Sequence, residues 1–367
     1  MLDLLVQPGA GAKPLIEAIE GAHKTIHIVI FRFDRGELEA ALKRAARRGV
    51  QVHALVAFTT TGQGGEKMLR ALEMRLLADG VSVSRTATDL VRYHDKLLII
   101  DSKTLFMLGF NFTYIDMDRS RSFGIMTQKR EWVQEAEKLF LADSTRQNYV
   151  PVCPTFLASP GNSRQELISF VSAAQKQLLI YDGKLTDLDM MRLLSEKAAQ
   201  GVEVRLIGAI GRRAAGITVA PCPMRLHAQA IIRDGEAMFL GSQSLRSLEL
   251  DARREVGLII EDAAVSRRAM ETFEADWAKS KALPASAVAT LPLLEAETEA
   301  EPPALTATTP AVPPTVAVKE VIKEAIMDAL LETLHDLPDT KEIKAAIKEG
   351  AKEALGAMAG QRTTTHE

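Results

Sequence analysis

The chain has 367 residues, of which 47% are hydrophobic and 25% are charged. This length exceeds the usual size of a single hydrophobic core, and the composition is that of a folded globular protein, which excludes a disordered or fibrous chain. The formal net charge of −3 excludes a strong overall positive field for nucleic acid.

The cysteines and the apolar runs indicate a cytoplasmic protein. Cys153 and Cys222 lie far apart and lack metal-ligand spacing, so the sequence predicts neither a disulfide framework nor a zinc site. Residues 1–8 lack the pattern of a signal peptide, and no run reaches the roughly 18–20 apolar residues that span a bilayer. We therefore expect a cytoplasmic protein that contacts any lipid substrate peripherally, from the membrane surface.

The first part of the chain alternates between helix and strand patterns. We expect a helix over residues 15–22, a buried strand over 24–33, a helix over 37–48 and a strand over 49–56. Residues 59–80 follow, with a glycine-rich start and a helical pattern over 66–78. We interpret this segment either as a loop and helix at the rim of a site or as a plain surface insertion.

The next block combines polar side chains with a buried strand. His94 and Lys96 are two positions apart in a strand pattern, so both side chains are expected on one face of the sheet. Asp101 opens a turn after the apolar run, and a second strand over 104–108 follows. It leads to Gly109-Phe110-Asn111, where a glycine and an amide can bring the backbone close to a phosphate.

The second half repeats the first. Helical patterns cover 167–174 and 187–200, and strand patterns cover 176–181 and 201–207. Gly49 and Gly201 occupy equivalent places, 152 residues apart, at the end of a helix and before β-branched residues. The two copies therefore each contain a strand–helix–strand unit.

A second matched block has a different offset. Residues 94–101 align with residues 227–234, both ends being shifted by 133. The difference between 152 and 133 means that the first copy carries 19 additional residues, which we place near residues 59–80.

This organisation predicts an α/β fold. Strand–helix–strand units place parallel strands side by side under helices, and sites form at the carboxyl ends of such strands. We predict a first half over residues 1–150 and a second over 151–283, related by a pseudo-twofold axis, each half an α/β/α sandwich.

The C-terminal part has a different composition. Residues 284–317 are rich in Ala, Pro and Thr, which is typical of an extended linker. Helical spacing returns over 318–360 and predicts two short amphipathic helices as an appendage. We expect this tail to mediate self-association or to dock on the body, with membrane-surface contact as the lesser alternative because acidic residues match the lysines.

The pattern His-x-Lys-x4-Asp followed by Gly-x-Asn, at His94, Lys96, Asp101 and Asn111, resembles the signature of the phospholipase D superfamily, in its cardiolipin synthase and phosphatidylserine synthase branch. The second copy departs from that pattern. It has His227, Gln229 and Asp234, and Gly241-Ser242-Gln243 stands where Gly-Ser-Asn is common. The second motif has thus lost a lysine.

The resemblance implies two unequal histidines. One attacks phosphorus to give a phosphohistidine, and the other protonates the leaving alkoxide; we assign His94 to the first role and His227 to the second, with Glu255 orienting His94. Lys96, Asn111, Gln229, Ser242 and Gln243 then contact the phosphate, and Asp101 and Asp234 brace turns. No metal or cofactor is required.

Three functions compete at this stage. The first is a phospholipase D-type phosphodiester hydrolase or phosphatidyltransferase acting on glycerophospholipids. The second is a nuclease of the same superfamily; the net charge and an aromatic content of 5% argue against nucleic acid as the partner. The third is a catalytically attenuated protein that binds phosphates or partners. Two residues suggest it: Gln229, which replaces the lysine of the motif, and Ser122, which is the counterpart of Glu255 in the first copy.

Overall fold

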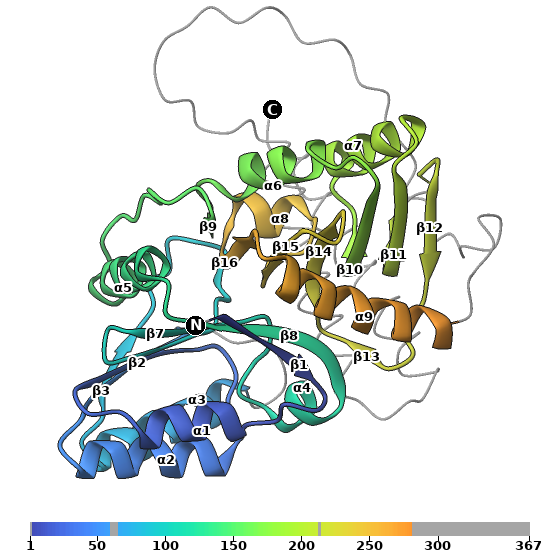
Figure 1. Ribbon diagram of the computed structural model, residues 1–367. Helices are drawn as coiled ribbons and strands as arrows, with labels where there is room; N and C mark the ends of the chain where they lie inside the picture. The colour runs from blue at the N-terminus through green and yellow to red at the C-terminus, as the bar shows by residue number, and fades with distance from the viewer. Residues whose placement is uncertain (1, 59–64, 212–213, 281–367) are drawn as a thin grey trace, which may run out of the picture. The chain divides into compact units, whose positions relative to one another are not determined.

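The computed structural model describes residues 2–58, 65–211 and 214–280 (Figure 1). Both copies belong to one compact unit. The expected linker at 284–317 and the expected tail helices at 318–360 lie outside the described residues, so the predictions made for them stay predictions.

The first copy is built on an eight-stranded sheet with the order β1-β8-β7-β6-β2-β3-β4, in which β13 also pairs with β8. Its strands are β1 (Leu2–Gln7), β2 (Thr25–Ile30), β3 (Gln51–Val56), β4 (Ser82–Arg85), β6 (Leu97–Ile100), β7 (Thr104–Leu108), β8 (Ser120–Thr127) and β13 (Arg225–Leu226). The helices of this copy are α1 (Lys13–Glu20), α2 (Gly36–Arg47), α3 (Gly65–Ala78), α4 (Tyr114–Asp118) and α5 (Arg130–Thr145).

The second copy repeats this design with the order β12-β11-β10-β14-β15-β16-β5, in which β9 also pairs with β16. Its strands are β5 (Arg92–Tyr93), β9 (Phe156–Ser159), β10 (Gln177–Leu185), β11 (Glu203–Ile210), β12 (Ile217–Ala220), β14 (Gln229–Arg233), β15 (Ala237–Gly241) and β16 (Arg253–Ile260). The helices are α6 (Ser163–Ser172), α7 (Leu188–Ala199), α8 (Ser247–Asp251) and α9 (Ala263–Lys279).

The strand–helix–strand units are confirmed in both copies. β2 pairs in parallel with β3, and β10 pairs in parallel with β11. Gly49 and Gly201, which follow the intervening helices, have φ values of 91° and 92°. Because a Cβ is strained at such angles, glycine ends each helix at the point where the next strand must begin.

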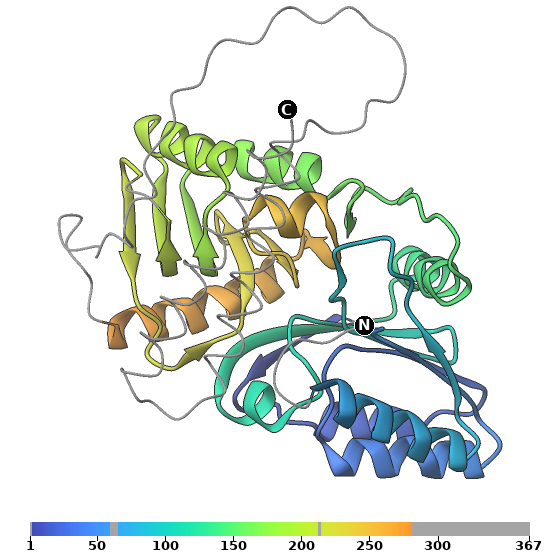
Figure 2. The ribbon, with the colours of Figure 1, turned by 180° about the vertical axis from the view of Figure 1, so that it is seen from behind.

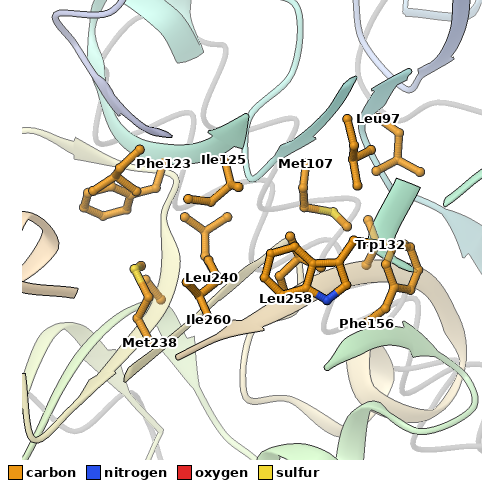
Figure 3. Packing of buried hydrophobic residues seen from close by; sticks show 14 of the residues in the cluster. Leu97, Met107, Phe123, Ile125, Trp132, Phe156, Met238, Leu240, Leu258 and Ile260 are labelled. Atoms are coloured by element: carbon orange, nitrogen blue, oxygen red, sulfur yellow. The ribbon is translucent and has the colours of Figure 1, made fainter. Parts of the chain in front are cut away.

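The two sheets face each other across a central apolar cluster (Figure 3). Phe123 and Ile125 of β8 lie opposite Leu240 of β15 and Leu258 of β16, and all four side chains are buried. Burial of one such side chain contributes about 1.5–3 kcal/mol. Helices α1, α2 and α3 cover the other face of the first sheet, and α6 and α7 cover the other face of the second (Figures 1 and 2).

Each copy lends a short strand to the other copy's sheet. β5 pairs with β16, with Arg92 opposite Arg253, and β13 pairs with β8, with Arg225 opposite Ser120. The chain returns to its own sheet only at β6 and β14. The strand predicted to begin at His94 begins three residues later, at Leu97, where β6 starts. Residues 94–96 form the crossing between the two sheets.

Buried ion pairs connect the copies in the same symmetric way. Arg121 of β8 donates from Nε and Nη2 to Asp276 of α9, at 2.6 and 2.9 Å. Arg254 of β16 donates from Nε and Nη2 to Asp143 of α5, with both distances 3.0 Å. The same offset of 133 relates both arginines and both aspartates. These pairs hold together the interface at which the histidines lie.

Candidate active site

The strand exchange places both histidines at the boundary between the copies. The backbone N–H of His94 donates to the carbonyl of Arg254 at 2.8 Å, and that of His227 donates to the carbonyl of Arg121 at 2.9 Å. Each histidine is thus fixed by the copy to which it does not belong, and its side chain is positioned for partners there.

His94 contacts Glu255 and Lys96. Its Nδ1 lies 3.0 Å from both carboxylate oxygens of Glu255, a residue 161 positions away on β16. The Nζ of Lys96 lies 3.1 Å from Nδ1 and 3.0 Å from Nε2. His94 is 8% exposed, whereas Lys96 and Glu255 are fully buried. The three side chains therefore form a closely packed, charge-bearing group.

The carboxyl group of Glu255 holds its proton strongly. Burial and the negative charge of Glu249 raise the pKa of Glu255 to about 8, against the opposing charges of Lys96 and Arg253. Glu249 behaves in the opposite way, because Arg246, Arg253 and His94 overcome its burial and lower its pKa to about 2. Of these two buried carboxyl groups, Glu249 therefore loses its proton more readily than Glu255.

His227 faces a different carboxylate, Asp116 at the middle of α4. Its Nε2 lies 3.5 Å from Oδ2 of Asp116. Asp116 also accepts from the backbone N–H and the side-chain amide of Asn111, at 3.0 and 2.8 Å, and from Arg225 at 2.6 Å. Burial alone would raise the pKa of Asp116, but His227, Arg225 and these hydrogen bonds hold it well below its usual range.

The phosphate-binding residues expected in the second motif have different environments. Gln229 begins β14 and is half-buried. The Ser242 hydroxyl accepts from the backbone N–H of Val256 at 3.1 Å, next to Glu255. The amide of Gln243 is buried and donates to Ser163 Oγ at 3.1 Å.

The structural counterpart of Asn111 is Ser244, not Gln243. The backbone N–H of Asn111 donates to Asp116, and that of Ser244 donates to Glu249. The offset of 133 relates both members of these pairs. Gly241 therefore corresponds to Leu108 and not to Gly109. The expectation that Gln243 takes the place of the asparagine is wrong by one residue.

Asp101 and Asp234 lie at the far ends of β6 and β14 from the histidines. Asp101 accepts from the backbone N–H groups of three successive residues at 23–25, and Asp234 does the same at 175–177. Their φ values are 53° and 57°, which aspartate tolerates better than most residues. Both side chains brace a turn.

Two residues of this site are not among those predicted from the sequence. Asp116 and Arg225 contact each other and flank His227. A signal was present, since the offset of 133 relates Asp116 to Glu249 and Arg225 to Arg92, and so preserves the charge in both cases. Among the described residues, no group of three or more His, Cys, Asp or Glu is placed to hold a metal ion.

A family profile described as "Cardiolipin synthase, PLD-like domain" matches residues 15–144 and 167–277, more than half of the chain. The chain belongs to this family. The two matched segments coincide with the two copies, each of which supplies one histidine to the site. Membership of this PLD-like family supports phosphodiesterase or phosphatidyltransferase activity in general terms.

Solved structures share the fold at low sequence identity. Polyphosphate kinase from Porphyromonas gingivalis has a TM-score of 0.62 and 17% identity over 74% of this chain; the match spans 46% of the kinase, about half its length. Phosphatidylserine synthase from Haemophilus influenzae Rd KW20 has a TM-score of 0.58 and 12% identity over 77% of this chain and 87% of its own. At these identities the likeness concerns the fold alone. A comparison with curated protein sequences gives no match.

None of the helices in the described part of the chain combines the length and apolar character needed to cross a bilayer.

Proposed function

We propose that this PLD-like protein transfers or hydrolyses the phosphodiester of a glycerophospholipid through a phosphohistidine on His94. The observation that carries the proposal is the pair of histidines from different copies, each held by a carboxylate across the interface, His94 by Glu255 and His227 by Asp116. Two imidazoles supported in this way can share one displacement between a nucleophile and an acid.

The environment of His94 suits the nucleophile. Glu255 holds the proton on the Nδ1 side, which leaves the Nε2 lone pair for phosphorus. As the Nε2–P bond forms and the P–O bond to the leaving alcohol breaks, positive charge grows on the ring. A carboxylate with high proton affinity at Nδ1 stabilises that charge. Lys96, 3.0 Å from Nε2, can bind a non-bridging phosphate oxygen at the same time.

The environment of His227 suits the acid. The ionised carboxylate of Asp116 lies 3.5 Å from its ring and favours the protonated imidazole. Gln229 takes the place of the lysine found in the first motif, so the second motif has a neutral side chain where the first has the ammonium group of Lys96. His227 then gives its proton to the leaving alkoxide and recovers one from the water or alcohol that attacks the phosphohistidine.

The first test is a lipid panel. The full-length protein should release a head group from one class of glycerophospholipid, and added alcohol should divert part of the product if the enzyme transfers as well as hydrolyses. Plasmid DNA under the same conditions should stay intact. Cleavage of DNA without lipid turnover would replace this proposal by the nuclease.

Asp116→Asn is expected to lower kcat about 10²–10³-fold, because the imidazolium of His227 loses its anion. The basic limb of the kcat profile should also move to lower pH, since His227 then loses its proton more easily. The kinetic measurement should cover pH 5 to 9. Asp118→Asn, on the same helix but 44% exposed and paired with Arg35, is the matched control and should leave both values unchanged. An unchanged pH profile in the Asp116 variant would remove Asp116 from this role.

A second candidate function follows from Gln229, which makes attenuated catalysis or simple phosphate binding the alternative. Gln229→Lys should raise kcat/KM about tenfold or more, because one cationic ligand can stabilise the transition state by a few kcal/mol. Gln200→Lys adds the same charge at an exposed position and should have no effect. If neither wild type nor Gln229→Lys turns over any phosphodiester, the binding function is the better account.

A further inference from the structure

Arg254 and Arg121, the arginines of the two buried ion pairs between the copies, have matching hydrogen bonds. Arg254 donates from Nε and Nη2 to Asp143, and from Nη1 to a backbone carbonyl at 3.0 Å. Arg121 donates from Nε and Nη2 to Asp276, and from Nη1 to a backbone carbonyl at 2.6 Å. Every nitrogen of both guanidinium groups therefore already has an acceptor.

A second carboxyl group interacts with Arg254 alone, that of Asp95 in the crossing between His94 and Lys96. Asp95 is 1% exposed, and neither of its carboxylate oxygens has a hydrogen-bond partner among the described residues. Its strongest favourable electrostatic interaction is with Arg254. By the offset of 133 the second copy has Ala228 at this position, so one arginine there faces one carboxylate.

The other charges around Asp95 do not neutralise it. Within its own segment Lys96 favours the ionised form, but Glu255 of β16 opposes that form more strongly. Asp143 of α5 interacts with the same arginine and is also buried, at 2% exposed. Three carboxyl groups thus lie around the cations of Arg254 and Lys96.

Two tyrosines complete the surroundings of the arginine. The ring centroids of Tyr93 and Tyr149 lie 5.7 and 5.8 Å from its Cζ. Their hydroxyl groups donate to Asp89 at 2.8 Å and to Glu135 at 3.1 Å, so neither is directed to Asp95. The arginine and the two aspartates therefore form a cluster in which one carboxyl group has no donor of its own.

The balance of charge in this cluster favours a bound proton. Burial raises the pKa of both Asp95 and Asp143, against the attraction of Arg254. One cation balances one carboxylate, so the other carboxyl group is more stable when it is neutral. In the unfolded chain both groups have ordinary pKa values of about 4, and the extra proton is then released.

We propose that Asp95 and Asp143 hold one proton between them beside Arg254, and that this proton makes the crossing at residues 94–96 sensitive to pH. With the proton bound, the cluster carries no net charge. When the proton is lost, a buried negative charge without a donor remains between His94 and Lys96, and the crossing opens more readily. The backbone N–H of His94, which donates to the carbonyl of Arg254, reports this opening.

The test is amide hydrogen exchange of the full-length protein, followed by mass spectrometry at pH 5 and pH 8 and corrected for the intrinsic exchange rates. A pKa that is higher in the closed form means that opening releases a proton, so protection falls as the pH rises. In wild type, protection over residues 92–97 should fall at least about tenfold, because one pKa unit corresponds to a tenfold change in the opening equilibrium.

Two variants remove the titrating group, and one serves as the control. Asp95→Ala introduces the residue that the second copy already has, and Asp95→Asn keeps the size without the charge. Both should remove most of the fall over residues 92–97 and leave the pH dependence over residues 225–230 unchanged. Asp189→Asn, at a side chain that is 61% exposed, should leave both segments as in wild type.

The outcome does not depend on the proposed function, because exchange is measured without substrate. The inference is overturned if wild type shows no fall over residues 92–97, or if the fall in Asp95→Ala is as large as in wild type. A fall that Asp95→Ala removes supports it, even if no phosphodiester is turned over. If Asp95→Asn does not fold, Asp95→Ala and wild type decide the question.

Discussion

His94→Ala is expected to lower kcat by at least about 10⁴-fold, and His227→Ala by about 10²–10⁴-fold. The reasons differ, since the first change removes the atom that attacks phosphorus and the second removes the proton donor. Substrates with p-nitrophenol as leaving group need no proton from the enzyme. They should therefore recover the first step in His227→Ala but not in His94→Ala.

The control for these variants is His23→Ala. His23 is exposed and lies at the turn that Asp101 braces, at the far end of β6 from His94, so its side chain can be removed without touching the site. If His94→Ala turned over substrate about as fast as His23→Ala, the mechanism proposed above would be contradicted. Equal behaviour of the two site variants with the p-nitrophenyl substrate would remove the division of roles.

Asp276→Ala is expected to reduce the free energy of unfolding by about 3–5 kcal/mol, because it leaves the buried charge of Arg121 without its carboxylate. The variant also removes the hydrogen-bond acceptor of the Tyr181 hydroxyl, which donates to Asp276 at 2.7 Å. Urea unfolding followed by circular dichroism measures the change.

The matched control for this prediction is Asp189→Ala, in a pair with Arg192 whose side chains are 61% and 70% exposed. Such a pair contributes about 0–1 kcal/mol. Similar losses for Asp276→Ala and Asp189→Ala would show that the ion pair between the copies does not stabilise their interface. A large loss only for Asp276→Ala supports the interface as the structural basis of the site.

The sequence could predict the elements that depend on local pattern. Gly49 and Gly201 marked helix ends because their positive φ is a local requirement. The shared offsets then placed β2 with β3 and β10 with β11 in the correct parallel pairing. Glu255 was also expected beside His94, because the family resemblance implies a contact across the two copies.

What the sequence could not predict depends on the exchange of β5 and β13. A strand of two residues is too short to show a periodic pattern in the sequence. The passage of the chain from β5 to β6 is therefore not visible there, and a single strand beginning at His94 is predicted in its place. Asp116 was missed for the same reason. Its contact with His227 exists only because the exchanged strand brings that histidine to α4, and the counterpart of Glu255 in the sequence is Ser122, which has no carboxylate.

The most direct test of the account is the identity of the covalent intermediate. The full-length protein is mixed with a p-nitrophenyl phosphodiester, quenched without acid because phosphoramidate bonds are acid-labile, and mapped by peptide mass spectrometry. We predict an adduct on the peptide that contains His94, more of it in His227→Ala because its hydrolysis lacks the second histidine, and none in His94→Ala. An adduct on His227, or one that persists in His94→Ala, would contradict the account.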